Sequence, residues 1–136
     1  MGSLIDTSIF IDAERNRLDL DQHLADRQED LFFMSVITAS ELLHGVHRAT
    51  PAHKAARTAA VEVWIQSFQM LDIDLPTARE HARLFADLKA SGNVVGAHDL
   101  WLAATCFTHD LKMVTANTRE FERVPGLKVE NWSIAP

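Results

Sequence analysis

The chain has 136 residues, the size of one domain with a single core. Apolar residues make up 47% and charged residues 24% of it, which is typical of a soluble globular protein. The net charge of −6 argues against binding nucleic acid through a broad basic surface, and the single cysteine excludes an internal disulfide and a multi-cysteine zinc site.

Short apolar strands alternate with longer helical segments along the chain. A strand over residues 4–5 is predicted to end at Asp6, and a helical turn follows over 7–13. The periodic apolar positions then predict, in chain order, an amphipathic helix over 19–28, a strand over 31–34, helices over 38–48 and 51–70, a strand over 71–73, a helix over 77–91, a largely buried helix over 99–108, and strands over 113–115 and 127–129.

Two of these helices carry large aromatic side chains whose faces can be predicted. Helical spacing puts Trp64 and Phe68 on the inward face of the 51–70 helix. It puts Phe85 inward on the 77–91 helix, together with Leu88. We expect all four to contribute to the core.

Alternating strands and helices predict an α/β fold, in which a parallel sheet is covered by helices on both faces. In such sheets, ligands bind outside the carboxyl ends of the strands. Asp6 ends one predicted strand, and Thr115 and Asn117 lie at the end of another. We therefore expect these residues to face one crevice.

Four acids, Asp6, Glu41, Asp99 and Glu120, each lie near a strand end or a helix start. Carboxylates that meet at the ends of several elements are a common way to hold hard divalent cations such as Mg²⁺, which prefer oxygen ligands. If the fold brings them together, much of the negative charge is local and would be offset by a bound cation.

Glu41 and Asp99 also have structural interpretations. Thr38-x-x-Glu41 has the pattern of a capping box, and the same pattern occurs at Thr77-x-x-Glu80, where nothing indicates chemistry. Asp99 would be favoured at a helix start by the helix dipole. Both interpretations stay open beside the functional one.

Asp6 and Glu120 differ in how well a structural role explains them. An acid at the end of a buried strand is costly to desolvate without a positive partner, so Asp6 favours a functional role. Glu120 could cap a short turn begun by Asn117. No single motif decides the question, and the combination of four carries the hypothesis.

Other kinds of site are poorly supported by the sequence. His44 and His47 share a helix face but have no third ligand for zinc, and His98 is a loop residue near the predicted site. Ser8 stands where an aspartyl-phosphate phosphatase would have a second aspartate. The sequence has no glycine-rich phosphate loop and no nucleophile elbow.

Four motifs in order along the chain carry a family resemblance: Asp6-Thr7-Ser8 with Asp12, Ser35-Val36-Ile37-Thr38-x-x-Glu41, Asp99-Leu100-Trp101-Leu102-Ala103-Ala104, and Thr115-Ala116-Asn117-x-x-Glu120-Phe121. Together they resemble the PIN-domain family, and within it the VapC-type toxins of bacterial toxin–antitoxin pairs. The resemblance covers essentially the whole chain, which implies a single PIN domain over residues 1–136.

This resemblance implies a three-layer α/β/α sandwich with a short, mostly parallel central sheet. It also implies a Mg²⁺- or Mn²⁺-dependent endoribonuclease that hydrolyses phosphodiester bonds of RNA, with tRNA or rRNA as the expected substrate. The implied partners are a cognate antitoxin that blocks the site and a second copy in a homodimer. We expect the protein in the cytoplasm and not in a membrane, because the sequence has no membrane-spanning run and no secretory signal.

Carried over residue by residue, the resemblance places Asp6, Glu41 and Asp99 on the three most regular acids of the family's site. The fourth position falls on either Asn117 or Glu120. Asp6 and Asp99 are then expected to bind the principal ion, with Glu41 as a further ligand or as the group that orients water. The residues expected to hydrogen-bond these carboxylates or a phosphate oxygen are Thr7, Thr38, Thr115 and Asn117.

Two alternatives remain. The chain could be a catalytically silent interaction module, in which Trp64 and Phe68 anchor a partner rather than the core. It could also be a DNA-directed, structure-specific nuclease of the same fold. For the ribonuclease, Arg15, Arg48 and Arg119 are candidates for contact with the RNA backbone.

Overall fold

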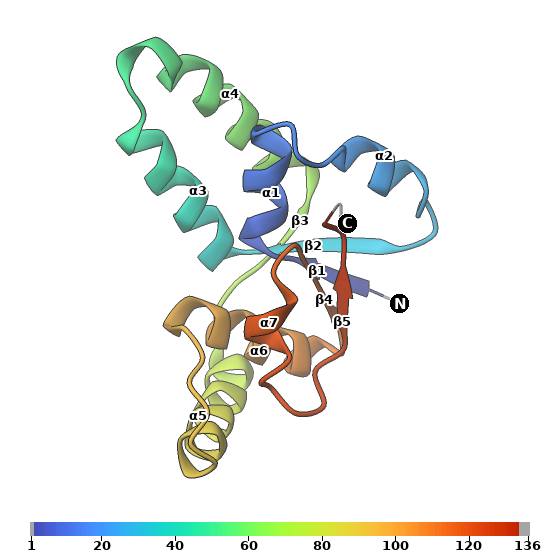
Figure 1. Ribbon diagram of the computed structural model, residues 1–136, viewed down its shortest axis with the longest axis vertical. Coiled ribbons are helices and arrows are strands. Elements are labelled where there is room, and N and C mark those ends of the chain that lie inside the picture. Colours follow the sequence, from blue (N-terminus) through green and yellow to red (C-terminus); the bar gives the residue numbers. More distant parts are fainter. Residues whose placement is uncertain (1, 134–136) are drawn as a thin grey trace.

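A computed structural model describes residues 2–133 as a five-stranded parallel sheet between two layers of helices (Figure 1). The strand order is β3-β2-β1-β4-β5. The elements are β1 (Gly2–Ile5), α1 (Thr7–Glu14), α2 (Leu20–Ala25), β2 (Leu31–Ser35), α3 (Val36–Arg48), α4 (Pro51–Ser67), β3 (Gln69–Leu71), α5 (Leu75–Ala90), α6 (Ala97–His109), β4 (Lys112–Thr115), α7 (Thr118–Phe121) and β5 (Val129–Asn131).

Successive residues of each strand point to opposite faces of the sheet, and each face has its own core. Ile5 and Val114 belong to the cluster formed with α1 to α4. Leu4 and Met113 belong to the cluster formed with α6 and α7. Figure 1 shows these two groups of helices on opposite sides of the strands, with α5 packed outside α6. The predicted α/β/α architecture is confirmed.

The central strand β1 lies between β2 and β4. From β1 the chain adds strands in one direction, and β4 and β5 then continue the sheet on the other side of β1. The order therefore reverses between β1 and β4, and ligands of open α/β sheets bind at such a switch point. Asp6 and Thr115 lie at the carboxyl ends of these two strands.

Several predicted boundaries were wrong by two or three residues. β3 and β5 are displaced from 71–73 and 127–129, because their registers pair Leu71 with Ser35 and Asn131 with Thr115. Leu127, predicted to lie in a strand, packs against the helices instead. Helix α2 ends at Ala25 rather than at 28, where the chain turns before β2.

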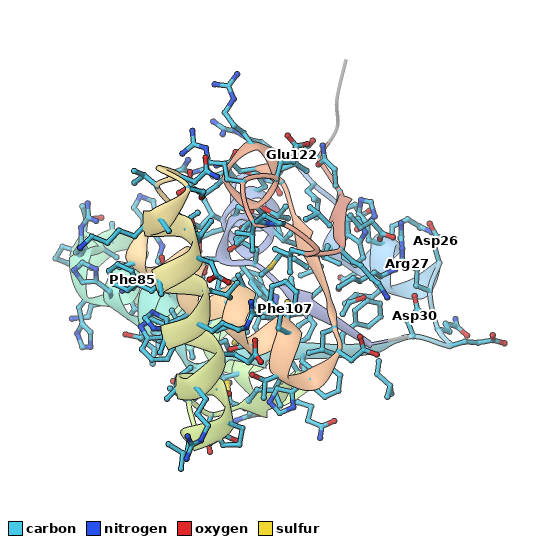
Figure 2. All side chains as sticks on the ribbon, turned by 90° about the horizontal axis from the view of Figure 1, so that it is seen from below. Asp26, Arg27, Asp30, Phe85, Phe107 and Glu122 are labelled. Atoms are coloured by element: carbon cyan, nitrogen blue, oxygen red, sulfur yellow. The ribbon has the colours of Figure 1, made fainter. Side chains whose placement is uncertain are left out.

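The inward faces of two helices differ in how well they were predicted. Phe85 was expected inside but is 52% exposed, and it lies on the outer side of α5 in Figure 2. The inward face of α5 is formed by Thr77, Leu84 and Leu88. The rings of Trp64 and Phe68 both contact Phe10, which places them in the core rather than on a free interface.

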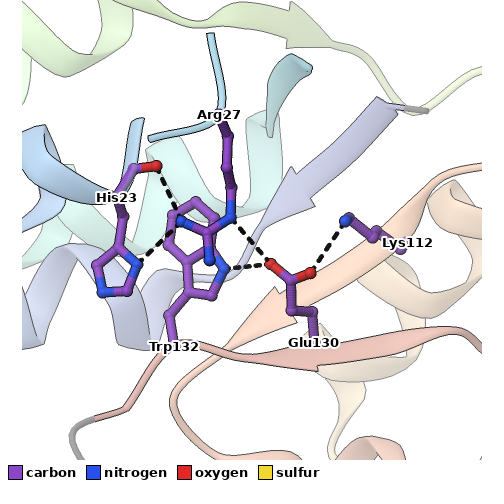
Figure 3. Close-up of polar contacts among 5 residues, drawn as sticks. All are labelled: His23, Arg27, Lys112, Glu130 and Trp132. Carbon is purple, nitrogen blue, oxygen red and sulfur yellow. Dashed lines mark hydrogen bonds and ion pairs between the residues drawn. The ribbon is translucent and has the colours of Figure 1, made fainter. Parts of the chain in front are cut away.

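A polar and aromatic cluster ties the edge strand β5 to α2 (Figure 3). Glu130 pairs with Lys112 at 3.0 Å and with Arg27 at 3.4 Å, and it accepts a hydrogen bond from the Trp132 indole. Arg27 lies 4.6 Å from the centroid of the Trp132 ring, the ring of His23 stacks on Trp132, and Arg27 and His23 also contact each other at 3.2 Å. This cluster fastens the last strand to a helix of the opening part of the chain.

No helix among residues 2–133 combines the length and the hydropathy needed to cross a membrane.

Candidate active site

Asp6 immediately follows β1 and is only 5% exposed. Its Oδ2 accepts hydrogen bonds from Ser8 Oγ at 2.7 Å and from Thr115 Oγ1 at 2.8 Å. Burial raises the pKa of Asp6, the two hydroxyl hydrogen bonds lower it, the charge of Glu41 raises it, and the net direction is upward. Asp6 is therefore a buried carboxylate held by hydroxyl groups rather than by a cation.

Ser8 was missed as a site residue in the sequence. Its hydroxyl donates to Asp6 and also accepts from the Ala116 backbone N–H at 3.0 Å. It thus joins the end of β1 to the end of β4. The signal was the Asp-x-Ser spacing at the start of a helix, where a serine hydroxyl can reach a side chain two residues back.

Glu41 lies in the second turn of α3, which begins two residues earlier than predicted. The N-cap is Ser35, whose Oγ accepts from the Ile37 backbone N–H at 3.0 Å, so the predicted Thr38-x-x-Glu41 capping box is wrong. The Thr77-x-x-Glu80 box is wrong for the same reason, because Asp74 caps α5. Glu41 is left free to point elsewhere.

The Glu41 carboxylate takes its partners from other elements. Thr7 Oγ1 donates to Glu41 Oε1 at 2.9 Å, and the buried hydroxyl of Thr38 lies 3.1 Å from Thr7 Oγ1. His98 Nδ1 lies 3.4 Å from Glu41 Oε2. Thr7, at the start of α1, thus fixes the position of the Glu41 carboxylate on α3.

Asp99 lies in the first turn of α6, close to the other acids. Burial first, and then the charges of Asp6, Glu120 and Glu41, raise its pKa to about 6, while His98 opposes the shift. A carboxyl group whose pKa is raised by three other carboxylates lies within their electric field. Asp99 Oδ2 and Glu120 Oε1 both lie beside Gly96, so these two acids are neighbours, and Asp6 and Glu41 lie near enough for their charges to act on Asp99. The helix-dipole interpretation of Asp99 is compatible with this position.

The two candidates for the fourth position have different surroundings. Glu120 Oε1 accepts from the Gly96 backbone N–H at 2.7 Å, and Oε2 lies 3.7 Å from Arg123. Glu120 therefore closes the start of α6 rather than capping a turn begun by Asn117. Asn117 is exposed, and within residues 2–133 only its backbone N–H is hydrogen-bonded, to Thr115 Oγ1 at 2.9 Å.

The side chains at this site offer oxygen atoms, from carboxylates and hydroxyl groups. Within residues 2–133, no three His, Cys, Asp or Glu side chains are grouped as closely as in a preformed metal site. Mg²⁺ is held by one or two carboxylates and keeps several waters, so two converging acids suffice for it. The donor set therefore fits a hard divalent cation.

A cleft of about 800 Å³ opens beside the acids, between α1, α3 and α4. Thr7, Glu41 and His98 line it, and so do Arg15 and Arg48, two of the three arginines expected to contact substrate. The third, Arg119, lies on α7 and is not among its lining residues.

Comparison with known proteins identifies the family. The family model described as "PIN domain" matches residues 3–127. The chain belongs to the PIN-domain family. The resemblance inferred from the four motifs is thereby confirmed, and the acids of this PIN domain come from the start, the middle and the end of the matched region.

The relatives of this PIN domain carry the name VapC. The chain is 34% identical over 130 residues to "Ribonuclease VapC1" of Rickettsia felis, covering 95% of each chain. It is 30% identical to the "tRNA(fMet)-specific endonuclease VapC" of Salmonella typhimurium, covering 95% of this chain and 96% of the relative. A solved structure of VapBC-5, a member of the VapBC family of toxin–antitoxin systems from Mycobacterium tuberculosis, superposes with a TM-score of 0.76 at 31% identity over 98% of both chains.

Proposed function

We propose that this PIN domain is a divalent-metal-dependent endoribonuclease that acts as the toxin of a toxin–antitoxin pair. The observation that carries the proposal is the gathering of Asp6, Glu41, Asp99 and Glu120 near the switch point of the sheet, where burial first, and then the charges of the other three acids, raise the pKa of Asp99 to about 6. Acids kept together at such an electrostatic cost are typical of a site that takes up a cation.

Asp6 and Asp99 would hold Mg²⁺ or Mn²⁺, which supplies the positive charge that polarises a phosphoryl oxygen and acidifies an attacking water. Ser8 and Thr115 fix the orientation of the Asp6 carboxylate through their hydroxyl groups.

Glu41 has the position of a group that orients the attacking water. Its Oε1 is held by Thr7, and its Oε2 lies toward His98 on the cleft side. Glu41 can accept a hydrogen bond from that water and so orient it, because a carboxylate offers only acceptor oxygens. Asn117 would donate its side-chain amide to a substrate phosphate, and its exposure and its backbone bond to Thr115 support this role.

RNA is the proposed substrate because the relatives at 30% identity or more that span nearly the whole chain are named as a ribonuclease and as a tRNA-specific endonuclease. We propose that the target is a tRNA or an rRNA loop, since single-stranded loops expose their bases and backbone to a protein. The acids provide the cutting chemistry, while the adjoining cleft and loops select the strand.

We further propose two protein partners in the cytoplasm. A cognate antitoxin would cover the acids, as the toxin–antitoxin relationship of VapBC-5 suggests. A second copy of the chain would pair through the α5 side, where Leu75, Phe85 and Val94 are more than half exposed.

The test is cleavage of total tRNA and rRNA by purified, antitoxin-free protein in Mg²⁺ or Mn²⁺, with single-stranded DNA of matching sequence as the substrate control. We expect discrete RNA cuts that disappear in EDTA and fall by at least about a thousandfold in Asp6→Asn and Asp99→Asn, because each removes a charge that holds the cation. Circular dichroism would verify that both variants are folded.

Asp72→Asn is the matched control, because Asp72 is an exposed aspartate in the loop after β3 and outside the site. It should cut at the wild-type rate. Full activity of both site variants, or cuts that persist in EDTA, would overturn the proposal. Cutting of DNA but not RNA would support the alternative nuclease.

A further inference from the structure

The cleft beside the acids is rich in positive charge although the whole chain carries −6. Three arginines line it: Arg15 at the end of α1, Arg48 at the end of α3, and Arg57 in α4. The carboxylates that line it are Glu14 and Glu41. The charge around this cleft is therefore opposite in sign to that of the molecule.

The three arginines are not equivalent. Arg57 Nε pairs with Glu14 at 2.9 Å, and its NH1 donates to the Gly45 carbonyl at 3.4 Å, so Arg57 fastens α4 to α1 and α3. Arg15 and Arg48 are exposed, and within residues 2–133 their side chains have no ion pair or hydrogen bond. Two guanidinium groups are thus available to a ligand in the cleft.

Other residues that line the cleft have apolar or small side chains, and one end of the cleft adjoins the acids. Ile11 and Ala60 add apolar surface to the cleft, and Leu42, which is only 6% exposed, contributes little. Thr7 and Glu41 belong both to the cleft and to the acid site, so the two are continuous. A ligand lying here would place one end at the acids.

We infer that this cleft holds the single-stranded RNA next to the cleaved bond, with Arg15 and Arg48 on successive backbone phosphates and bases against the apolar side. The inference rests on the proposed function and adds the residues that position the strand. Single-stranded nucleic acids are held in positively charged grooves that follow the backbone, and in this cleft the bases would lie against aliphatic side chains such as Ile11. Guanidinium groups bind phosphate in a bidentate manner, which fixes position as well as charge.

Continuity with the acids favours RNA over an acidic protein segment. A strand whose phosphodiester lies at Asp6 and Asp99 must leave the site on some side, and the cleft that begins at Glu41 and Thr7 provides a path lined with cations. The cations then offset the repulsion between the phosphates and the four acids. Arg15 and Arg48 are positioning residues in this scheme and take no part in the chemistry.

The test is equilibrium binding of a fluorescein-labelled single-stranded RNA of about 12 nucleotides, the length that one small domain covers. Anisotropy is measured in EDTA with Asp99→Asn protein, so that no strand is cut. We expect Arg15→Gln and Arg48→Gln each to weaken binding about five- to tenfold, and each to flatten the plot of log K against log salt by about 0.7.

Arg79→Gln is the matched control, because Arg79 is an exposed arginine on α5, on the opposite side of the sheet, with no ion pair among the described residues. It should bind RNA as the parent does. Equal affinities and salt slopes for all three variants would overturn the inference.

A polyglutamate peptide of similar length is the competing ligand. If the cleft variants lose the peptide but keep the RNA, the cleft is a protein-docking site and the inference is wrong. Cleavage assays report separately on the proposed function. If RNA binding depends on the two arginines but no RNA is cut, only the proposed nuclease activity is wrong. If RNA is cut but binding does not depend on the arginines, only the proposed role of the cleft is wrong.

Discussion

Single residues at the site are held by neutral hydroxyl groups. Asp6 receives two hydroxyl hydrogen bonds, and Glu41 receives one from Thr7. Hydroxyl donors orient a carboxylate while leaving most of its charge uncompensated. The acids therefore keep their charge for a ligand, and the folded protein bears the repulsion among them.

Asp99 should make the metal-free protein less stable at neutral pH. Its pKa rises from 3.8 unfolded to about 6 folded, so the folded state binds this proton more tightly. The stability that the proton contributes is complete below about pH 4 and is lost as the pH rises through 6. In EDTA we expect Asp99→Asn to be more stable than the wild type by about 1 kcal/mol at about pH 7.5, allowing for solvent screening, and no different at about pH 4.

Urea denaturation at the two pH values measures this difference in the free energy of unfolding. Asp72→Asn provides the comparison, because it removes an exposed aspartate outside the cluster. A gain for Asp99→Asn of the same size at both pH values would contradict the pKa argument. So would a loss of stability at neutral pH.

Among the secondary-structure elements, α7 contacts α6 through Phe121 in the core and through the Glu120 carboxylate at the start of α6. Gly96 cannot cap its own helix with a side chain, and Glu120 supplies the acceptor for the Gly96 N–H at 2.7 Å. We expect Glu120→Ala to lower the free energy of unfolding by about 1 kcal/mol, as for a lost helix cap. Glu120→Gln keeps an acceptor oxygen and should cost much less.

Chemical denaturation of both variants tests this link. Glu122→Ala is the control, because Glu122 is an exposed glutamate at the end of the same short helix and points outward in Figure 2. If Ala and Gln at position 120 cost the same, the charge rather than the hydrogen bond joins the two helices.

The order of the helices and strands could be predicted because each one shows its own periodic pattern of apolar residues. The same patterns indicate where elements begin or end, and the Asp6, Glu41 and Asp99 motifs lie near those positions. The residues that cap the helices were harder to predict. Ser35 is both the last residue of β2 and the cap of α3, so a pattern that starts counting at Thr38 misses it.

Contacts between distant segments could be predicted only where strand ends were expected to meet. The Thr115–Asp6 bond, which joins residues 109 apart, agrees with the expected meeting of two strand ends, whereas no local pattern predicted the Glu120–Gly96 bond between residues 24 positions apart. Phe85 failed for a related reason: its face was assigned from helical spacing alone, whereas the packing of α6 decides which side of α5 is buried.

At the scale of the whole molecule, a bound cation should act as a stabilising ligand. With Mg²⁺ at about 100 times its dissociation constant, the folded state gains about 2.7 kcal/mol, which corresponds to a rise in Tm of roughly 5–10 °C. We expect this rise for the wild type in scanning fluorimetry. The double variant Asp6→Asn/Asp99→Asn should show little of it.

Titration with Na⁺ at matched ionic strength separates site binding from general screening of the net charge of −6. An equal Tm rise with Na⁺, or in the double variant, would show that the acids do not hold the cation.

The strand order has a consequence for how the protein is made. Asp6 is synthesised well before the hydroxyl of Thr115 that holds its carboxylate, which is added 109 residues later. Strand β1 likewise cannot pair with its neighbour β4 until β4 has been synthesised. A growing chain therefore lacks the complete set of acids and their supports until Glu120 has been added and has left the ribosome. If the protein cuts RNA, the translating ribosome that produces it meets no finished site before that point.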